Sequence, residues 1–113
     1  MNLISAPQPP FDLQVINVSS TTATITWNTP TPTQVTPWGA VFNYEVALTE
    51  HRFGLPLETE NTAVESFTFT GLEEFDNYSV VVAAENQIGR SDFSTRLYFS
   101  TRQAGMHNII KDR

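Results

Sequence analysis

Hydrophobic and polar residues alternate one by one along the stretch SFTFTGLEEFDNYSVVVAAEN at residues 66–86. In its first part Phe67 and Phe69 alternate with small polar residues, and from Tyr78 onward every second residue is apolar. Such alternation is typical of a strand with one face on a core and the other face in water. Gly71 lies where the first strand has to stop, since glycine accepts turn conformations that other residues avoid. The stretch therefore predicts two strands with a polar crossing between them.

Other stretches with this alternation, rich in β-branched and aromatic residues, predict five more strands. They lie at about residues 13–18, 22–27, 41–50, 55–61 and 92–101. Turn-prone residues separate them, and no stretch has a convincing helical period. Seven short strands without a helix predict an all-β fold, a seven-stranded antiparallel β-sandwich of the immunoglobulin-like kind.

A single domain at residues 9–102 holds all of these strands. We interpret residues 1–8, which lack a hydrophobic period and lead into two prolines, as an N-terminal linker. Residues 103–113 carry no strong signal and are interpreted as a C-terminal tail or linker. Within the domain, residues 31–40 contain two prolines and a glycine and predict a long loop, with Trp38 near its far end.

Composition narrows the classes of partner. The 113 residues suffice for one domain with a modest core, and their net charge is −6. An acidic surface argues against nucleic acid and against anionic membranes. The longest run without a polar residue is 80–84, whereas a membrane span needs roughly 20 apolar residues. A secretory signal pattern is also absent, and the lack of cysteine excludes disulfides and thiolate sites within the chain.

Signals for catalysis, metals and cofactors are weak. The chain has two histidines, His51 in a predicted turn and His107 in the tail, and we interpret both as solvated loop residues rather than catalytic groups. Glu73, Glu74 and Asp76 crowd the predicted crossing, where solvated charge is the favoured interpretation and weak Ca²⁺ binding the lesser alternative. No phosphate-binding glycine motif occurs. We therefore expect no catalytic, metal or cofactor site and no small-molecule ligand.

Two tripeptides match the acceptor pattern for N-linked glycans. They are Asn17-Val18-Ser19 and Asn77-Tyr78-Ser79. Either asparagine is a possible glycosylation site if the protein passes through a secretory pathway.

Several motifs together resemble a fibronectin type III domain over residues 9–102. They are ATITWNTP at 23–30, YEV at 44–46, SFTFTGL at 66–72, YSVVVAAEN at 78–86 and NQIGRS at 86–91. The resemblance implies a structural core that includes Trp27, Tyr44, Leu72 and Tyr78. It also implies a tyrosine corner, in which the Tyr78 hydroxyl is expected to bond to a main-chain acceptor upstream. One departure is Glu74, which stands where the family often has proline and implies a less rigid corner.

The resemblance also implies a function. We expect a non-catalytic extracellular module, a spacer or protein–protein interaction unit of a multidomain receptor, adhesion or matrix protein. Its partners would be neighbouring domains and another protein. An accessory module of a secreted microbial enzyme and an intracellular cytoskeletal module are the alternatives. The RGD tripeptide of some relatives is absent, since Arg90-Ser91-Asp92 stands there instead, and no WSxWS box precedes the last strand.

Four residues are candidates for contact with a partner, Trp38, Phe42, Phe53 and Val81. Trp38 is either an exposed anchor or a lid over the end of the core. Phe53 is expected at a hairpin tip, where it either meets a partner or packs on the neighbouring strand. Val81 and Ala83 are expected on the outward face of their strand, where Phe42 and Ala47 would complete a contact patch.

Overall fold

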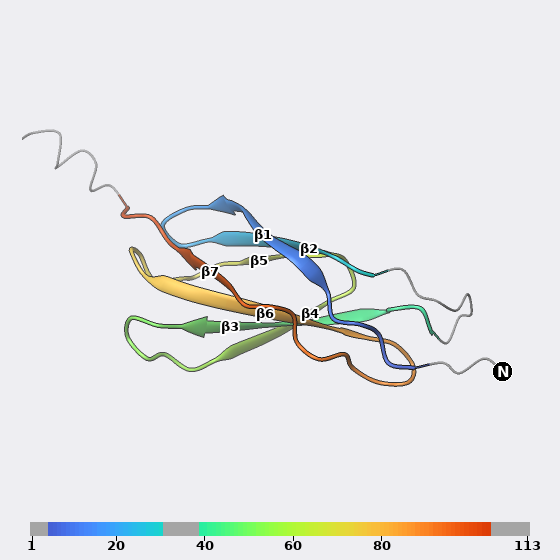
Figure 1. The fold of residues 1–113 in the computed structure, drawn as a ribbon. Coiled ribbons are helices and arrows are strands. Elements are labelled where there is room, and N and C mark those ends of the chain that lie inside the picture. The colour runs from blue at the N-terminus through green and yellow to red at the C-terminus, as the bar shows by residue number, and fades with distance from the viewer. Residues whose placement is uncertain (1–4, 31–38, 105–113) are drawn as a thin grey trace, which may run out of the picture.

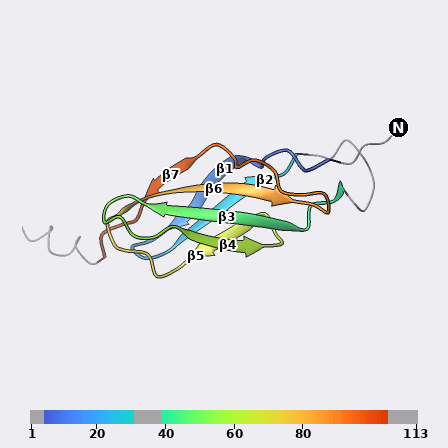
Figure 2. The same cartoon turned by 90° about the horizontal axis from the view of Figure 1, so that it is seen from below.

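The computed structural model describes residues 5–30 and 39–104. These residues form two antiparallel sheets packed face to face, and Figures 1 and 2 show the two layers. The strands are β1 (Phe11–Val18), β2 (Ala23–Asn28), β3 (Asn43–Glu50), β4 (Glu58–Thr62), β5 (Ser66–Phe69), β6 (Asn77–Glu85) and β7 (Leu97–Ser100). One sheet has the order β1-β2-β5 and the other β4-β3-β6-β7. The predicted seven-stranded antiparallel β-sandwich is confirmed.

The core lies between the sheets because the inward positions of each strand are apolar. Ile25 of β2, Val46 of β3 and Val82 of β6 have no exposed surface. The rings of Trp27 and Tyr44 meet edge to face across the two sheets, with centroids 5.4 Å apart. The same cluster contains Ala23, Leu48, Phe69, Leu72, Tyr78, Val80, Ala84 and Phe99.

The last strand is shorter than its predicted span of 92–101. β7 contains four residues, and the segment before it pairs with β6 partly through side chains. Ser94 Oγ accepts a hydrogen bond from the N–H of Val82 at 3.0 Å, and Ser91 Oγ accepts one from the N–H of Ala84 at 2.8 Å. Hydroxyl groups therefore satisfy strand donors where a regular ladder would use carbonyl groups.

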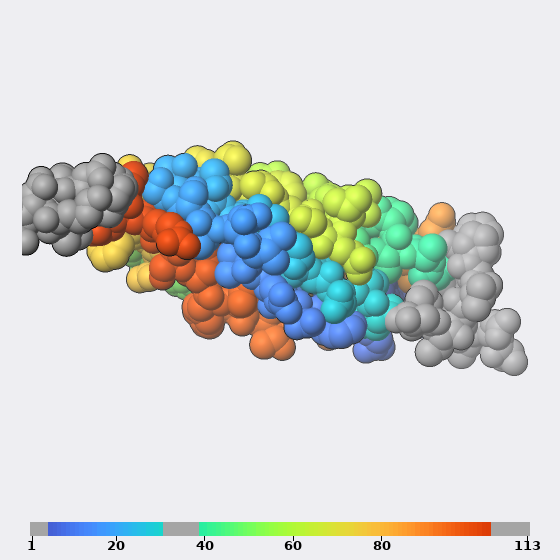
Figure 3. Space-filling view, turned by 90° about the horizontal axis from the view of Figure 1, so that it is seen from above, coloured from blue at the N-terminus to red at the C-terminus, as the bar shows by residue number. Residues whose placement is uncertain are grey.

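The first strand is irregular as well. β1 pairs with β2, but its register shifts between Phe11 and Gln14 and again between Val15 and Asn17. Asp12, at the first shift, has φ of +57°, which is uncommon for a residue with a side chain. Figure 3 shows β1 on the surface with β7 beside it. The strand that opens the domain is therefore joined to its sheet by an interrupted ladder.

The described chain begins at one end of the sandwich and finishes at the other (Figure 1). We call these the N-terminal end and the C-terminal end. At the N-terminal end, Asn86 Nδ2 donates to the carbonyl of Ser5 at 2.7 Å. At the C-terminal end, the N–H of Arg102 donates to the carbonyl of Ser19 at 3.0 Å. Both ends of the domain are thereby tied to the body of the sandwich.

Val81 and Ala83 lie on the face of β6 away from the core, as predicted, but the prediction that they form an exposed contact patch is wrong. Val81 is only 8% exposed and Ala83 has no exposed surface. Arg90, beside the far edge of β6, reaches across that strand to an ion pair with Glu45 on β3, at 2.5 Å. Since Glu45 lies opposite Ala83 in the register, the long charged side chains cover Ala83. Ala47, the register partner of Val81, is also buried.

Within the described residues, the structure contains no helix with the length and apolar character that a bilayer span requires.

Candidate interaction surface at the C-terminal end

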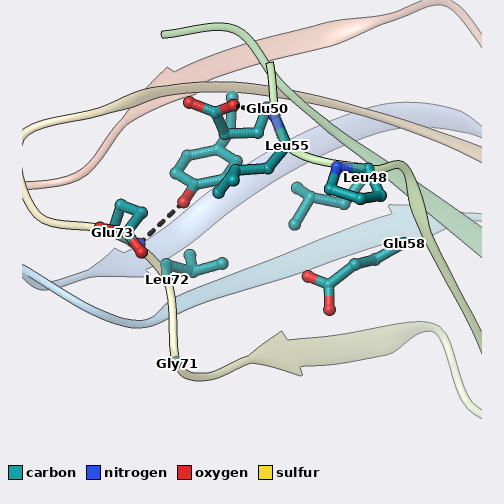
Figure 4. A pocket seen from close by; sticks show the side chains of 9 residues that line it. Leu48, Glu50, Leu55, Glu58, Gly71, Leu72 and Glu73 are labelled. Atoms are coloured by element: carbon teal, nitrogen blue, oxygen red, sulfur yellow. Dashed lines mark hydrogen bonds between the residues drawn. The ribbon is translucent and has the colours of Figure 1, made fainter. Parts of the chain in front are cut away.

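The crossing from β5 to β6 is organised around Tyr78. The hydroxyl oxygen of Tyr78 accepts a hydrogen bond from the main-chain N–H of Glu73 at 2.8 Å (Figure 4). The predicted bond between this hydroxyl and a main-chain group upstream is therefore present, but the main chain supplies the donor and not the expected acceptor. Gly71 takes up the turn with φ of +69°, and the N–H of Leu72 donates to the carbonyl of Thr21 at 2.9 Å. Burial raises the pKa of the Tyr78 phenol.

The two residues that follow β7 bind the same crossing. Thr101 Oγ1 donates to the carbonyl of Glu73 at 2.7 Å, and the N–H of Phe75 donates to the carbonyl of Arg102 at 3.1 Å. Glu74, which replaces the usual proline, is exposed between these two anchored residues. The corner is thus held at both sides of Glu74 without a ring at that position.

Glu50, the last residue of β3, is buried, and its carboxylate accepts hydrogen bonds from the main chain of the loop that follows. Its Oε2 accepts hydrogen bonds from the N–H groups of Arg52 at 2.8 Å and Phe53 at 2.6 Å, and its Oε1 accepts one from Leu55 at 2.7 Å. Burial by itself would raise the pKa of Glu50, but the Leu55 N–H, the Asp76 side chain and the other two N–H groups lower it to about 2. Glu50 is therefore a structural carboxylate.

Asp76 lies against Glu50 and is only 1% exposed, so the interpretation of Asp76 as solvated charge is wrong. Its Oδ1 accepts from the N–H of Asn77 at 2.7 Å, whereas Oδ2 has no N–H donor among the described residues. Burial and the hydrogen bond to Glu50 raise the pKa of Asp76. A protonated Asp76 can donate to the Glu50 carboxylate, and the two acids then share one proton.

The arrangement gives no sign of a metal centre. Over residues 5–30 and 39–104, no three histidine, aspartate or glutamate side chains gather closely enough to hold an ion. His51 Nε2 is hydrogen-bonded to Ser79 Oγ at 2.8 Å, and the centroid of its ring lies 5.9 Å from that of Tyr98. His107 lies outside the described residues.

Next to the buried acids, three side chains form an exposed group that we call the exit cluster, Arg52, Phe53 and Phe75. The Arg52 guanidinium carbon lies 5.0 Å from the ring centroid of Phe53 and 5.5 Å from that of Phe75. Arg52 also donates to the Phe75 carbonyl at 2.6 Å. The two rings are 56% and 57% exposed. A cation held between two open aromatic rings is a group that partners can recognise.

Two hollows lie at this end of the sandwich, and one of them is lined by residues of the exit cluster. One, of about 350 Å³, is lined by Arg52, Phe75, Asn77 and Ser100. Inside it Ser100 Oγ donates to Asn77 Oδ1 at 2.7 Å. The other, of about 340 Å³, lies over the tyrosine corner (Figure 4). Its lining residues are Leu48, Glu50, Leu55, Pro56, Glu58, Gly71, Leu72, Glu73 and Tyr78.

The predicted contact residues do not form one surface. Phe53 follows the end of β3 at the C-terminal end, whereas Phe42, 52% exposed, precedes the start of β3 at the N-terminal end, where its N–H donates to the carbonyl of Glu85. The eight residues of β3 separate them, which corresponds to roughly 27 Å at a rise of about 3.4 Å per residue. Trp38 lies outside the described residues. The exposed candidates Phe42 and Phe53 thus lie at opposite ends of the sandwich, and the alternative of a side patch around Val81 is not formed.

Both acceptor asparagines are exposed, Asn17 on β1 and Asn77 at the start of β6. The four predicted core residues, Trp27, Tyr44, Leu72 and Tyr78, are all buried. Sequence reasoning missed Arg52 and Phe75, because neither belongs to an alternating pattern. The one feature of the sequence that could have drawn attention to Phe75 is its position two residues before Asn77, a glycan acceptor.

Comparison with known proteins agrees with this geometry. Residues 5–100 match the family model for the fibronectin type III domain. The chain belongs to the fibronectin type III family. Human receptor-type tyrosine-protein phosphatase F is 36% identical over 84 residues, which are 74% of this chain and 4% of that protein. The chicken cell adhesion molecule DSCAML1 is 30% identical over 103 residues, which cover 85% of this chain and 5% of that protein.

Solved structures show the same fold. The fibronectin type III domain of human fibronectin type III domain containing protein 3 has a TM-score of 0.71 at 21% identity, with 88% of this chain and 89% of that one covered. The chain thus has the size of one such domain and spans only a small part of the curated relatives it matches.

Proposed function

We propose that this domain is a non-catalytic extracellular module, which spaces its neighbours and binds another protein, within a multidomain receptor, adhesion or matrix protein. The path of the chain is the observation that carries the proposal. The described chain begins at one end of the sandwich and leaves at the other, and each end is hydrogen-bonded to the body. A domain with this path joins its neighbours in a line.

The relatives agree with this role. One is a receptor-type phosphatase and another is a cell adhesion molecule, and in both the matched region is a small fraction of a long chain. The domain would therefore be one unit among many, and any catalytic residues of the parent protein would lie outside it.

The exposed aromatic residues at the two ends are the proposed contacts with a protein partner. Phe53 belongs to the exit cluster, where Arg52 covers one side of its ring and leaves more than half of the side chain open. Phe42 holds a corresponding exposed position at the opposite end, and Trp38 is retained as a proposed contact from the sequence. Aromatic side chains beside arginine are common interface anchors.

The proposal is tested by secreting the chain from mammalian cells as an antibody-Fc fusion and measuring its binding to cultured cells. We expect saturable binding that protease treatment of the cells abolishes. Phe53→Ala should weaken it by roughly tenfold if the side chain is an anchor. Ile16→Ala is the matched control, since it removes an exposed apolar side chain from the middle of β1. Protease-resistant binding to insoluble polysaccharide would instead favour an accessory module of a microbial enzyme.

A further inference from the structure

Asn77 lies at the edge of a hollow that nothing in the described part of the chain fills. It is the first residue of β6, with its side chain exposed. Its Oδ1 is fixed by the Ser100 hydroxyl at 2.7 Å, whereas its Nδ2 donates to no acceptor among the described residues. Nδ2 is the atom to which an N-linked sugar is attached, and Tyr78 and Ser79 complete the acceptor tripeptide. The reactive nitrogen is thus oriented and open.

The aromatic residue two positions earlier forms a wall of the same hollow. Phe75 keeps φ of +52°, a left-handed conformation that costs free energy in a residue with a side chain. The carbonyl of Arg102 accepts from its N–H, and Arg52 donates to its carbonyl, so the ring is held in this exposed position. The hollow of about 350 Å³ then lies between the ring, Arg52, Ser100 and Asn77 itself.

We propose that Asn77 carries an N-linked glycan whose innermost N-acetylglucosamine lies in this hollow against the ring of Phe75. The C–H groups on one face of a pyranose are weakly positive, and the face of an aromatic ring is negative. Arg52 offers N–H donors to the hydroxyl and acetamide oxygens of the sugar. The inference rests on the proposed function, because the glycan is added only on a secretory route.

The contact has an energetic consequence that an ordinary surface glycan lacks. In the folded domain the strand start and the left-handed turn hold the asparagine and the ring side by side, whereas the unfolded chain does not. A sugar that packs on the ring therefore stabilises the folded state in particular, and the exposed ring becomes covered.

Asn17 provides an internal control. It is also exposed, but the residue two positions before it is Val15, which packs partly buried against the core. A sugar on Asn17 would have no aromatic ring at the corresponding position. The two acceptor sites thus differ in the one feature on which the inference depends.

The experiment compares single-site proteins from mammalian cells whose glycans are trimmed enzymatically to one N-acetylglucosamine. Asn17→Gln leaves the sugar on Asn77 only, and Asn77→Gln leaves it on Asn17 only. Each is compared with the same variant made in bacteria, without sugar. We expect the single sugar on Asn77 to raise the melting temperature by about 4 °C or more, and to raise it by less than about 1 °C when Phe75→Ala is added. The sugar on Asn17 should have no effect that depends on Phe75.

Three results would overturn the inference. They are an Asn77 that stays bare while Asn17 is modified, a temperature shift at Asn77 that persists unchanged in Phe75→Ala, and the absence of any shift. None of these bears on the proposed extracellular role. That role fails separately if the protein from its natural source carries no glycan at either asparagine and remains inside the cell.

Discussion

The hydroxyl oxygen of Tyr78 accepts a hydrogen bond from the main-chain N–H of Glu73, five residues earlier in the chain. Loss of the hydroxyl would leave this N–H without its acceptor at the crossing between the two sheets. We expect Tyr78→Phe to lower the free energy of unfolding by about 1–2 kcal/mol in urea denaturation. Tyr98→Phe is the matched control, since Tyr98 is 68% exposed and should change stability by less than about 0.5 kcal/mol. Equal effects of the two variants would show that the corner bond contributes nothing.

The opposite pKa shifts of Glu50 and Asp76 predict how stability depends on pH. The pKa of Asp76 is raised above its ordinary value of 3.8, first by burial and then by Glu50, so the folded state keeps a proton that the unfolded chain has lost. Its contribution to stability is fully present below about pH 4 and decreases as the pH rises through the raised pKa. The pKa of Glu50 is lowered from 4.5 to about 2, so its contribution is present above 4.5 and is lost as the pH falls toward 2.

Asp76→Asn separates the two contributions. The amide can still donate to Glu50 and accept from the N–H of Asn77, but it cannot titrate. We therefore expect the urea midpoint of the variant to decrease less than that of the original protein as the pH rises from 4 toward 8. Both proteins should lose stability below pH 4, because Glu50 is unchanged. Parallel curves across the whole pH range would exclude a shared proton.

The left-handed backbone at Phe75 predicts that two substitutions by small residues differ in their effect on stability. Both Phe75→Gly and Phe75→Ala remove the exposed ring, but only glycine accepts φ of +52° without a steric cost. In protein made without glycans, the glycine variant should be more stable than the alanine variant by about 1 kcal/mol. Glu74→Gly and Glu74→Ala form the control pair, since Glu74 is not among the residues with positive φ, and there alanine should be the more stable. The opposite order at Phe75 would mean that the turn relaxes.

The buried hydroxyl of Ser94 predicts that a small substitution at this position destabilises the fold. It accepts from the N–H of Val82 inside the sandwich, in place of a carbonyl group. Ser94→Ala should therefore lower the free energy of unfolding by about 1–3 kcal/mol, because a buried donor loses its acceptor. Ser100→Ala removes an exposed hydroxyl and should cost less than about 0.5 kcal/mol. The measurement is the unfolding of both variants in guanidinium chloride. Similar midpoints would contradict a stabilising hydrogen bond between Ser94 and Val82.

The succession of seven strands along the chain and the corner could be predicted because they depend on local patterns. Alternation correctly predicted that every second residue of β6 from Tyr78 packs in the core. Gly71 correctly marked the turn, where φ is +69°. Strand bounds were less accurate where side chains replace main-chain partners. The span before β7 looked continuous, since a serine that accepts a hydrogen bond cannot be distinguished in sequence from a serine in a ladder.

Which outward-facing residues are exposed could not be predicted in the same way, because side chains from other strands and loops can cover them. Ala83 alternates outward as expected, but Arg90 and Glu45 meet across β6 and cover it. Asp76 looked like one solvated acid among three, but it is buried where Glu50, 26 positions earlier, and Thr101, 25 positions later, lie against it. Such contacts join segments that no local pattern relates.

The interrupted pairing of β1 has a mechanical consequence for a domain whose chain runs from end to end. Tension applied through the two termini would load the β1–β2 and β6–β7 ladders along their length, so that several hydrogen bonds have to break together. The β6–β7 register runs without a shift over four pairs, whereas the β1 register shifts twice. Under a stretching force we therefore expect β1 to detach first, which leaves β2 to β7 as an extended intermediate that a single-molecule pulling experiment can resolve.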